Sequence, residues 1–363
     1  MSDSRRSLTD RRVSINGRVI GPAEPPYVIA ELSANHRGSK AKAIETIVAA
    51  AEAGADAVKF QHYRPETITV RGDHPDLTVS GGTLWDGRQL WDLYDEAMTP
   101  WEWTPDLVET ASRCGITWLS SPFDPTAVDF LVELDVPAIK IASFELVDLP
   151  LIRDAASRGR PLLLSTGMAS LGEIDAAVHA ARGAGAEELI LLRCNSGYPA
   201  SPSEMNLRAI PEMRRLWDVV VGLSDHTLGH TAAVAAVALG ACVIEKHFIL
   251  QRSDGGPDAA FSAEPEELQA LVDAVRDAHA ALGSVTFGPS ERELSSLAFR
   301  RSLRMAEAAR TGEILTESMV RSLRPAGGLP PDAIGDVLGM RVARDLEVGD
   351  PLVWSDLMTP EAP

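Results

Sequence analysis

Two histidines come at corresponding ends of two successive β-rich runs. Residues 219–224 lead to His226, and residues 242–246 lead to His247. If these runs are parallel neighbouring strands, the two imidazoles lie side by side at one end of the sheet. Each histidine also stands within two residues of a carboxylate. The pair predicts a metal or anion site, with a purely structural histidine as the alternative at either position.

Lysine is rare in this chain and falls on predicted strands. Only five of the 34 cationic residues are lysines, and three of these are Lys59, Lys140 and Lys246. An ammonium group is a compact charge that suits phosphate or carboxylate without the fixed geometry of a guanidinium. The strand lysines therefore predict anion binding, with chance or local packing as the alternative for each one.

Eight short β-rich runs alternate with amphipathic or alanine-rich helical patterns. They cover residues 27–31, 55–61, 117–121, 138–143, 161–166, 188–194, 219–224 and 242–247. This alternation predicts an α/β protein built on a closed (β/α)₈ TIM barrel, with an open doubly wound sheet as the alternative. The Gly-x-Gly-x-x-Gly fingerprint does not follow the first run, which counts against a dinucleotide-binding sheet.

Polar side chains gather where the predicted strands end. They are Glu31, Lys59, Lys140, Ser143, Ser165, Ser196, Ser224, His226 and His247. A barrel is filled with apolar side chains, so polar groups at its end need a function. Lysines with hydroxyls suit a phosphate and a carboxylate, and two histidines suit a divalent metal that acts on a carbonyl as a Lewis acid. Together they indicate carbon–carbon chemistry on a phosphorylated, acidic small molecule.

The chain divides into three predicted parts. Residues 1–283 form the barrel domain, which begins with a hairpin around Asn16-Gly17. Residues 284–298 form a linker, and residues 299–363 form a small domain with a faint internal repeat, too small to be catalytic alone. Within the barrel, residues 62–104 form a long insertion with four of the seven tryptophans. The insertion is a lid or binding loop, or else a satellite packing cluster.

Bulk composition narrows the class of partner. A net charge of −18 argues against nucleic acid or an anionic membrane. Apolar runs stay well short of the ~18 residues of a membrane span, and the polar start does not resemble a signal peptide. Cys114, Cys194 and Cys242 lack metal-site spacing and are predicted to be buried thiols in a reducing, cytoplasmic compartment.

The strand ends resemble the sialic acid synthase family, whose members condense phosphoenolpyruvate with an N-acylated aminosugar. The matching stretches are "IAELSANH" at 29–36, "ADAVKFQ" at 55–61, "KIASFE" at 140–145, "LSTGM" at 164–168, "GLSDHTLG" at 222–229 and "IEKHF" at 244–248. The end of the chain, with "RRSL" at 300–303 and "LRPAGG" at 323–328, is similar to that family's antifreeze-like (SAF) domain. The resemblance covers nearly the whole chain.

Three further stretches resemble the pseudaminic acid synthases of that family. They are "GGTLWDGRQLWDLYDEAMTPWEW" at 81–103, "SSPFDPTAVDFL" at 120–131 and "RSDGGPDAAFS" at 252–262. This narrower resemblance implies a 2,4-diacetamido-2,4,6-trideoxyhexose as the sugar. The alternatives are an N-acetylneuraminate or legionaminate synthase, a sugar-phosphate sensor without turnover, and a Schiff-base aldolase.

The family resemblance implies a role for each strand-end residue. His226 and His247 would bind Mn²⁺, Mg²⁺ or Co²⁺, which orients and polarises the sugar aldehyde. Glu31 would act in proton transfer or in positioning water. The phosphate and carboxylate of phosphoenolpyruvate would be bound by Lys59, Lys140, Ser143 and Ser165, with Ser196 and Ser224 nearby.

On the sugar side, the resemblance implies Tyr198 and Asp258 as lining residues. Arg324 of the small domain would reach the sugar in a partner subunit's barrel, which implies a homodimer with exchanged C-terminal domains. Two positions depart from the family pattern. Arg37 stands where Asn is usual, and Asn195 stands where Thr is common.

Overall fold

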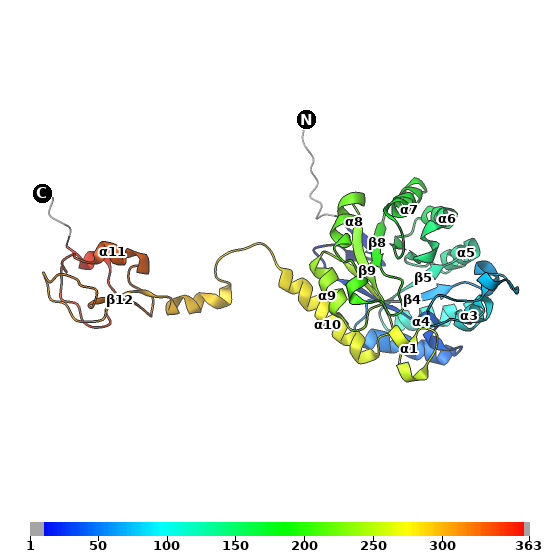
Figure 1. The fold of residues 1–363 in the computed structure, drawn as a ribbon, viewed down its shortest axis with the longest axis horizontal. Helices are drawn as coiled ribbons and strands as arrows, with labels where there is room; N and C mark the ends of the chain where they lie inside the picture. Colours follow the sequence, from blue (N-terminus) through cyan, green and yellow to red (C-terminus); the bar gives the residue numbers. More distant parts are fainter. Residues whose placement is uncertain (1–10, 359–363) are drawn as a thin grey trace, which may run out of the picture. The chain divides into compact units, whose positions relative to one another are not determined.

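The structure is a computed structural model that describes residues 11–358. The chain divides into two compact units between Gly283 and Ser284. In the first unit, eight parallel strands form a closed barrel, and helices surround the strands (Figure 1). The predicted TIM barrel is therefore confirmed, and the open sheet is excluded.

Each barrel strand is followed by a helix on the outside. In barrel order the strands are β10 (Val243–His247), β3 (Tyr27–Glu31), β4 (Ala57–His62), β5 (Thr117–Pro122), β6 (Ile139–Ile141), β7 (Leu162–Ser165), β8 (Leu189–Cys194) and β9 (Val220–Asp225). The outer helices are α1 (Lys40–Glu52), α4 (Thr104–Arg113), α5 (Pro125–Glu133), α6 (Leu149–Ser157), α7 (Leu171–Gly183), α8 (Ala209–Trp217), α9 (Thr231–Ala238) and α10 (Pro265–Leu282).

Alternation along the strands divides the apolar core into two clusters. Outward side chains such as Val58 and Val221 pack with the helices, whereas inward side chains such as Ile29 and Leu163 pack inside the barrel. Two residues further along several strands, the inward face becomes polar, at Glu31, Lys59, Lys140, Ser165, Ser224 and Glu245. The interior is therefore apolar up to the carboxyl ends of the strands, where active sites of this fold form.

The predicted hairpin is present and closes the other end of the barrel. It consists of β1 (Val13–Ile15) and β2 (Arg18–Ile20), which pair antiparallel. Asn16 and Gly17 have φ values of 50° and 77°, the left-handed pair that an Asn-Gly turn accommodates best. The apolar side chains of the hairpin belong to the same cluster as the barrel interior.

The insertion between β4 and β5 is partly helical. It contains α2 (Pro65–Ile68), η2 (Pro75–Leu77), α3 (Leu90–Ala97) and η3 (Trp101–Trp103). Trp101 stacks on Phe130 of α5, with ring centroids 4.7 Å apart. Trp85 instead donates its indole N–H to the carbonyl oxygen of Pro257, at 3.0 Å, in the loop that follows β10. The insertion thus combines a packed base with a segment at the barrel mouth.

The second unit is a small domain with its own apolar core. It contains η8 (Glu291–Phe299), β11 (Ser302–Met305), β12 (Val320–Leu323), η9 (Pro331–Ala333), α11 (Ile334–Val337) and η10 (Trp354–Asp356). The internal repeat consists of residues 309–315 and residues 343–352. These two stretches lie side by side, because Ala309 and Leu346 exchange backbone hydrogen bonds of 2.9 and 2.8 Å. Residues 284–298, predicted as a linker, include most of η8.

One cysteine differs from its prediction. Cys194 and Cys242 are buried, but Cys114 is only half-buried because it caps the end of α4 instead of lying in the sheet. Across residues 11–358, the structure contains no helix with the length and apolar character needed to cross a membrane.

Two glycines test how tightly the barrel is packed. A Cβ on Gly222 of β9 would lie 2.5 Å from the carbonyl oxygen of Val243, whereas a Cβ on Gly172 of α7 would meet nothing within 4 Å. We expect Gly222→Ala to lower the free energy of unfolding by about 1–3 kcal/mol or more. Gly172→Ala should raise it by ~0.4–1 kcal/mol. Urea unfolding followed by tryptophan fluorescence measures both, and equal stabilities of the two variants would contradict this packing.

Candidate active site

Four charged side chains lie together inside the carboxyl end of the barrel. Lys140 Nζ is 3.1 Å from Glu245 Oε1, and Lys59 Nζ is 3.9 Å from the same oxygen. Lys59 also forms an ion pair with Glu31. None of the four side chains is more than 5% exposed. Two lysines thus neutralise two carboxylates, as burial of so many charges requires.

Burial and ion pairing act against each other on these groups. Burial raises the pKa of Glu31, whereas the two lysines overcome burial and hold the pKa of Glu245 well below its ordinary value. Burial alone would lower the pKa of Lys59, but the carboxylates raise it; at Lys140 burial dominates and lowers the pKa. Glu245, which lies between the lysines, is therefore the weaker base of the two carboxylates, and Glu31 is the stronger.

Serine hydroxyls lie on neighbouring strand ends. Ser224 donates to the shared carboxylate at 3.1 Å, and Ser143 Oγ accepts a hydrogen bond of 3.1 Å from the amide of Gly167. A Cβ on Gly167 would lie 2.2 Å from Ser196 Oγ and 2.7 Å from Ser143 Oγ, so this close approach requires glycine. Ser165 Oγ is buried and has no hydrogen-bond partner within residues 11–358. The predicted serines therefore leave hydroxyl capacity for an anion.

The two histidines meet as the sequence predicts. Their ring centroids are 5.3 Å apart. Nδ1 of His226 donates to the carbonyl oxygen of Asn195 at 2.7 Å, which leaves Nε2 as the nitrogen able to bind a metal. Nδ1 of His247 is buried without a hydrogen-bond partner in the described part of the chain, and lies 3.9 Å from Asp258 Oδ2. Burial, together with neighbouring cations, lowers the pKa of His247.

These donors fit a divalent cation that keeps open positions. Among residues 11–358, no group of three or more His, Cys, Asp or Glu side chains is arranged to hold a metal by itself. His226 and His247 would supply two ligands and leave the others to substrate or water, as in catalytic metal sites. A neutral, unpaired imidazole nitrogen is the form that binds a metal.

The sequence did not single out Cys194 as a neighbour of this pair. Its Sγ lies 3.9 Å from Nδ1 of His226. This contact lowers the pKa of the thiol to about 7 despite burial. Burial alone would lower the pKa of His226, but the contact with Cys194, together with the Asn195 carbonyl, raises it. Cys194 was detectable as the last residue of a predicted strand, but its closeness to a histidine depends on the pairing of β8 with β9.

Asp225 and Glu245 precede the two histidines in sequence, and their proximity suggested a shared site. Within the described residues, neither carboxylate forms an ion pair with a histidine. Glu245 pairs with the inward lysines. Asp225 forms an ion pair of 2.9 Å with Lys246, which points outward because side chains alternate along β10. The carboxylate that approaches a histidine is Asp258, from the loop after β10.

Aromatic rings line the side of the site next to the histidines. The ring centroid of Tyr198 lies 4.4 Å from that of His226 and 5.5 Å from that of Trp85. Phe261 lies 4.9 Å from both Tyr198 and His247. The structure therefore brings together residues from the insertion, from the loop after β8 and from the 252–262 loop.

Three polar residues at strand ends belong to the site although they were not selected from the sequence: Ser33, Gln61 and Glu145. Gln61 donates to Glu31 Oε1 at 2.9 Å and to Ser33 Oγ at 3.0 Å. Burial raises the pKa of Glu145 to about 7, and its Oε2 has no hydrogen-bond partner in the described residues. Their position after predicted strands was the available signal, but polar residues of these types are also common in loops.

The two departures from the family pattern have local structural roles. Arg37 has a left-handed backbone (φ 48°), which Asn adopts more readily, and its side chain lies against residues 255–256. Asn195 accepts a hydrogen bond of 2.8 Å from the amide of Gly197. Arg324 is exposed directly after β12 of the second unit.

Comparison with known proteins agrees with the fold. The sequence matches the NeuB family over residues 46–287 and the SAF domain over residues 300–358. It is 43% identical over 330 residues to the pseudaminic acid synthase of Campylobacter jejuni serotype O:23/36, covering 91% of this chain and 96% of that protein. It is 35% identical over 354 residues to the N,N'-diacetyllegionaminic acid synthase of Legionella pneumophila, covering 94% and 98%.

A solved structure shows the same architecture. The N-acetylneuraminic acid synthetase of Leptospira borgpetersenii, in complex with citrate, matches with a TM-score of 0.71 and 31% identity. The match covers 79% of this chain and 95% of that chain.

The paired lysines predict an anion site that can be tested with inorganic phosphate. We expect Lys140→Met to weaken phosphate binding at least about tenfold, because a hydrogen bond to a charged group contributes about 1.5–3 kcal/mol. Lys40→Met on α1, where Lys40 pairs with Asp106, should leave the affinity unchanged. Titration calorimetry measures both, and wild-type affinity in Lys140→Met would contradict the assignment.

Proposed function

The chain belongs to the NeuB family of nonulosonic acid synthases, and from this premise we propose that it is a pseudaminic acid synthase. The proposed reaction condenses phosphoenolpyruvate and water with 2,4-diacetamido-2,4,6-trideoxy-L-altrose and releases phosphate. The observation that carries the proposal is the buried pair Lys59 and Lys140 in the same barrel mouth as the pair His226 and His247. The lysine pair suits an anionic substrate, and the histidine pair suits a metal that polarises a carbonyl.

Phosphoenolpyruvate would bind across the lysine side of the mouth. Its phosphate and carboxylate would take hydrogen bonds from Lys59, Lys140, Ser143, Ser165, Ser196 and Ser224. The carboxylates that pair with the lysines in the present structure offset the cost of burying both ammonium groups inside the barrel. The same charges then stabilise the negative charge that develops on phosphate as its C–O bond breaks.

The sugar would lie on the aromatic side, with its open-chain aldehyde toward His226 and His247. A bound Mn²⁺, Mg²⁺ or Co²⁺ would supply Lewis-acid polarisation of the aldehyde oxygen. Tyr198 and Asp258 would position the sugar, since both lie beside the histidines. The methylene carbon of phosphoenolpyruvate attacks the aldehyde carbon, and water then adds at C2 of the phosphoenolpyruvate unit before phosphate leaves.

Glu31 would handle the proton of this water or position it. Burial raises the pKa of Glu31, which makes it a stronger proton acceptor than an exposed carboxylate, and the amide of Gln61 fixes its Oε1. A carboxyl group with this environment can accept a proton from attacking water in a way that Glu245, held ionised between two lysines, cannot.

Two further parts of the proposal come from the family. Arg324 would contact the sugar in the barrel of a second copy, within a dimer that exchanges C-terminal domains. A legionaminate or N-acetylneuraminate synthase is the second candidate, favoured by the 35% identity to the Legionella enzyme. The higher identity to the Campylobacter pseudaminic acid synthase supports the first candidate.

A substrate panel tests the reaction and the sugar together. The protein is mixed with phosphoenolpyruvate, Mn²⁺ and either the altrose derivative, the legionaminate precursor or N-acetylmannosamine. We expect phosphate release and a nine-carbon product to be fastest with the altrose derivative, and His247→Ala to abolish both. Turnover fastest with another sugar would replace the substrate assignment, and an absence of phosphate release with every sugar would reject the proposed function.

Trp85 tests which part of the insertion selects the sugar. It contacts Tyr198 and the carbonyl of Pro257, so we expect Trp85→Ala to raise the KM for the sugar about tenfold while the KM for phosphoenolpyruvate stays unchanged. Trp91→Ala is the matched control, because Trp91 lies on the same insertion but stacks with Arg71. Steady-state kinetics with each substrate varied would show equal effects of the two variants if the insertion acts only as a packed base.

A further inference from the structure

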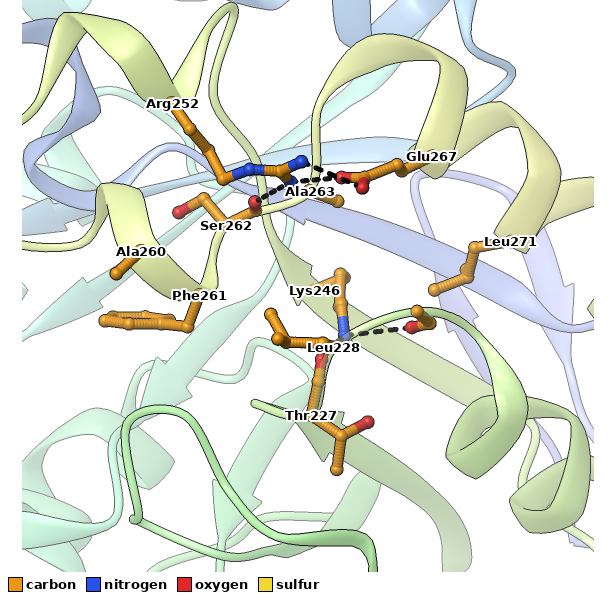
Figure 2. A pocket seen from close by; sticks show the side chains of 11 residues that line it. Thr227, Leu228, Lys246, Arg252, Ala260, Phe261, Ser262, Ala263, Glu267 and Leu271 are labelled. Carbon is orange, nitrogen blue, oxygen red and sulfur yellow. Dashed lines mark hydrogen bonds and ion pairs between the residues drawn. The ribbon is translucent and has the colours of Figure 1, made fainter.

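Lys246 is the strand lysine that the anion site does not use. It follows Glu245 and precedes His247 on β10, but its side chain points away from the barrel interior and is 2% exposed. Its ammonium group donates to Asp225 Oδ2 at 2.9 Å, to the carbonyl oxygen of Thr227, and to that of Gly229 at 3.2 Å. Figure 2 shows the side chain ending beside the Thr227–Leu228 segment. All three N–H donors of Lys246 therefore have acceptors.

These acceptors surround His226 in the sequence. The parallel register of β9 and β10 ends at the pair Asp225 and Lys246, so His226 lies one residue beyond the ladder. His247, in contrast, is still paired in register with Glu31 of β3. The ladder therefore fixes the backbone of His247, whereas the backbone of His226 depends on contacts outside the ladder, such as the hydrogen bond of 3.0 Å from the amide of Ala200 to the His226 carbonyl oxygen.

The side chain of Asp225 also restrains the 225–229 segment. Its Oδ1 accepts hydrogen bonds from the amide and the hydroxyl of Thr227, at 2.9 and 2.8 Å. Its Oδ2 binds Lys246. The residues before and after His226 are thus tied to each other and to the residue before His247.

We propose that Lys246 is a positioning residue that sets the spacing of the two histidine ligands from outside the barrel. The ammonium group extends the β9–β10 ladder beyond its last backbone pair and holds the 225–229 segment, so that His226 is fixed relative to His247. Removing one partner of a buried ion pair costs much more free energy than the pair contributes, because the other charge is left buried and unpaired. We therefore expect the segment to shift when either Lys246 or Asp225 is changed. This inference rests on the two-histidine metal site of the proposed function.

Because Lys246 lies outside the barrel interior, it can be substituted without changing any residue proposed to contact a substrate. Lys246 and Thr227 line a cavity of about 190 Å³, bounded by Leu271 of α10 and by Phe261 (Figure 2). A methionine at position 246 therefore has adjoining free space and does not overpack the core. Lys246→Met and Asp225→Asn each remove the charge pairing while leaving both histidines and both inward lysines in place.

The experiment measures Mn²⁺ binding by titration calorimetry on the full chain, with and without phosphoenolpyruvate, and steady-state kinetics. We expect both variants to weaken Mn²⁺ affinity by about 10- to 100-fold, as other groups that orient metal ligands do. The dissociation constant of phosphoenolpyruvate should change less than threefold. Asp56→Asn is the control, because Asp56 is a buried carboxylate paired with Arg18 and Arg276 at the other end of the barrel. It should lower the melting temperature and leave Mn²⁺ affinity unchanged.

Wild-type Mn²⁺ affinity in Asp225→Asn overturns the inference, and this variant decides the matter if Lys246→Met does not fold. Equal loss of affinity in Asp56→Asn also overturns it, because the effect would then follow stability alone. A wild-type protein that binds no Mn²⁺ removes the metal site and this inference with it. Phosphate release in the substrate panel still judges the proposed reaction separately.

Discussion

Compensation of buried charge is the constraint on which this barrel mouth depends. Lys59, Lys140, Glu31 and Glu245 all lie at inward positions from which water is largely excluded. An isolated charge there would cost far more than the fold can supply, so the four groups are stable only as a set. The same set leaves two ammonium groups and several serine hydroxyls ready for a charged substrate. The stability of the barrel and the proposed binding of phosphoenolpyruvate would therefore use the same side chains.

The two-residue period of the strands gives neighbouring residues of one strand different functions. On β10, Glu245 and His247 face the interior, and Lys246 faces the helices. Glu245 pairs with Lys140, His247 lies beside the other histidine, and Lys246 binds the segment that carries that histidine. A shift of register by one residue would exchange these roles, so the closed barrel specifies the chemistry as well as the shape.

The aromatic side of the site is assembled from segments far apart in the chain. Trp85 comes from the insertion, Tyr198 from the loop after β8, and Asp258 and Phe261 from the loop after β10. Loops of this kind vary without disturbing the barrel that supports them.

The sequence by itself determined the eight strands, the hairpin turn and the polar strand ends, because hydrophobic periodicity and turn residues such as Asn16-Gly17 act locally. It also indicated which residue types meet at the barrel mouth, since parallel strands end at the same edge. Only the tertiary structure decided the partner of each group. Asp225 binds Lys246 and not a histidine, and Cys194 lies beside His226. These contacts depend on strand pairing and side-chain direction, which arise when the barrel closes and which no local pattern encodes.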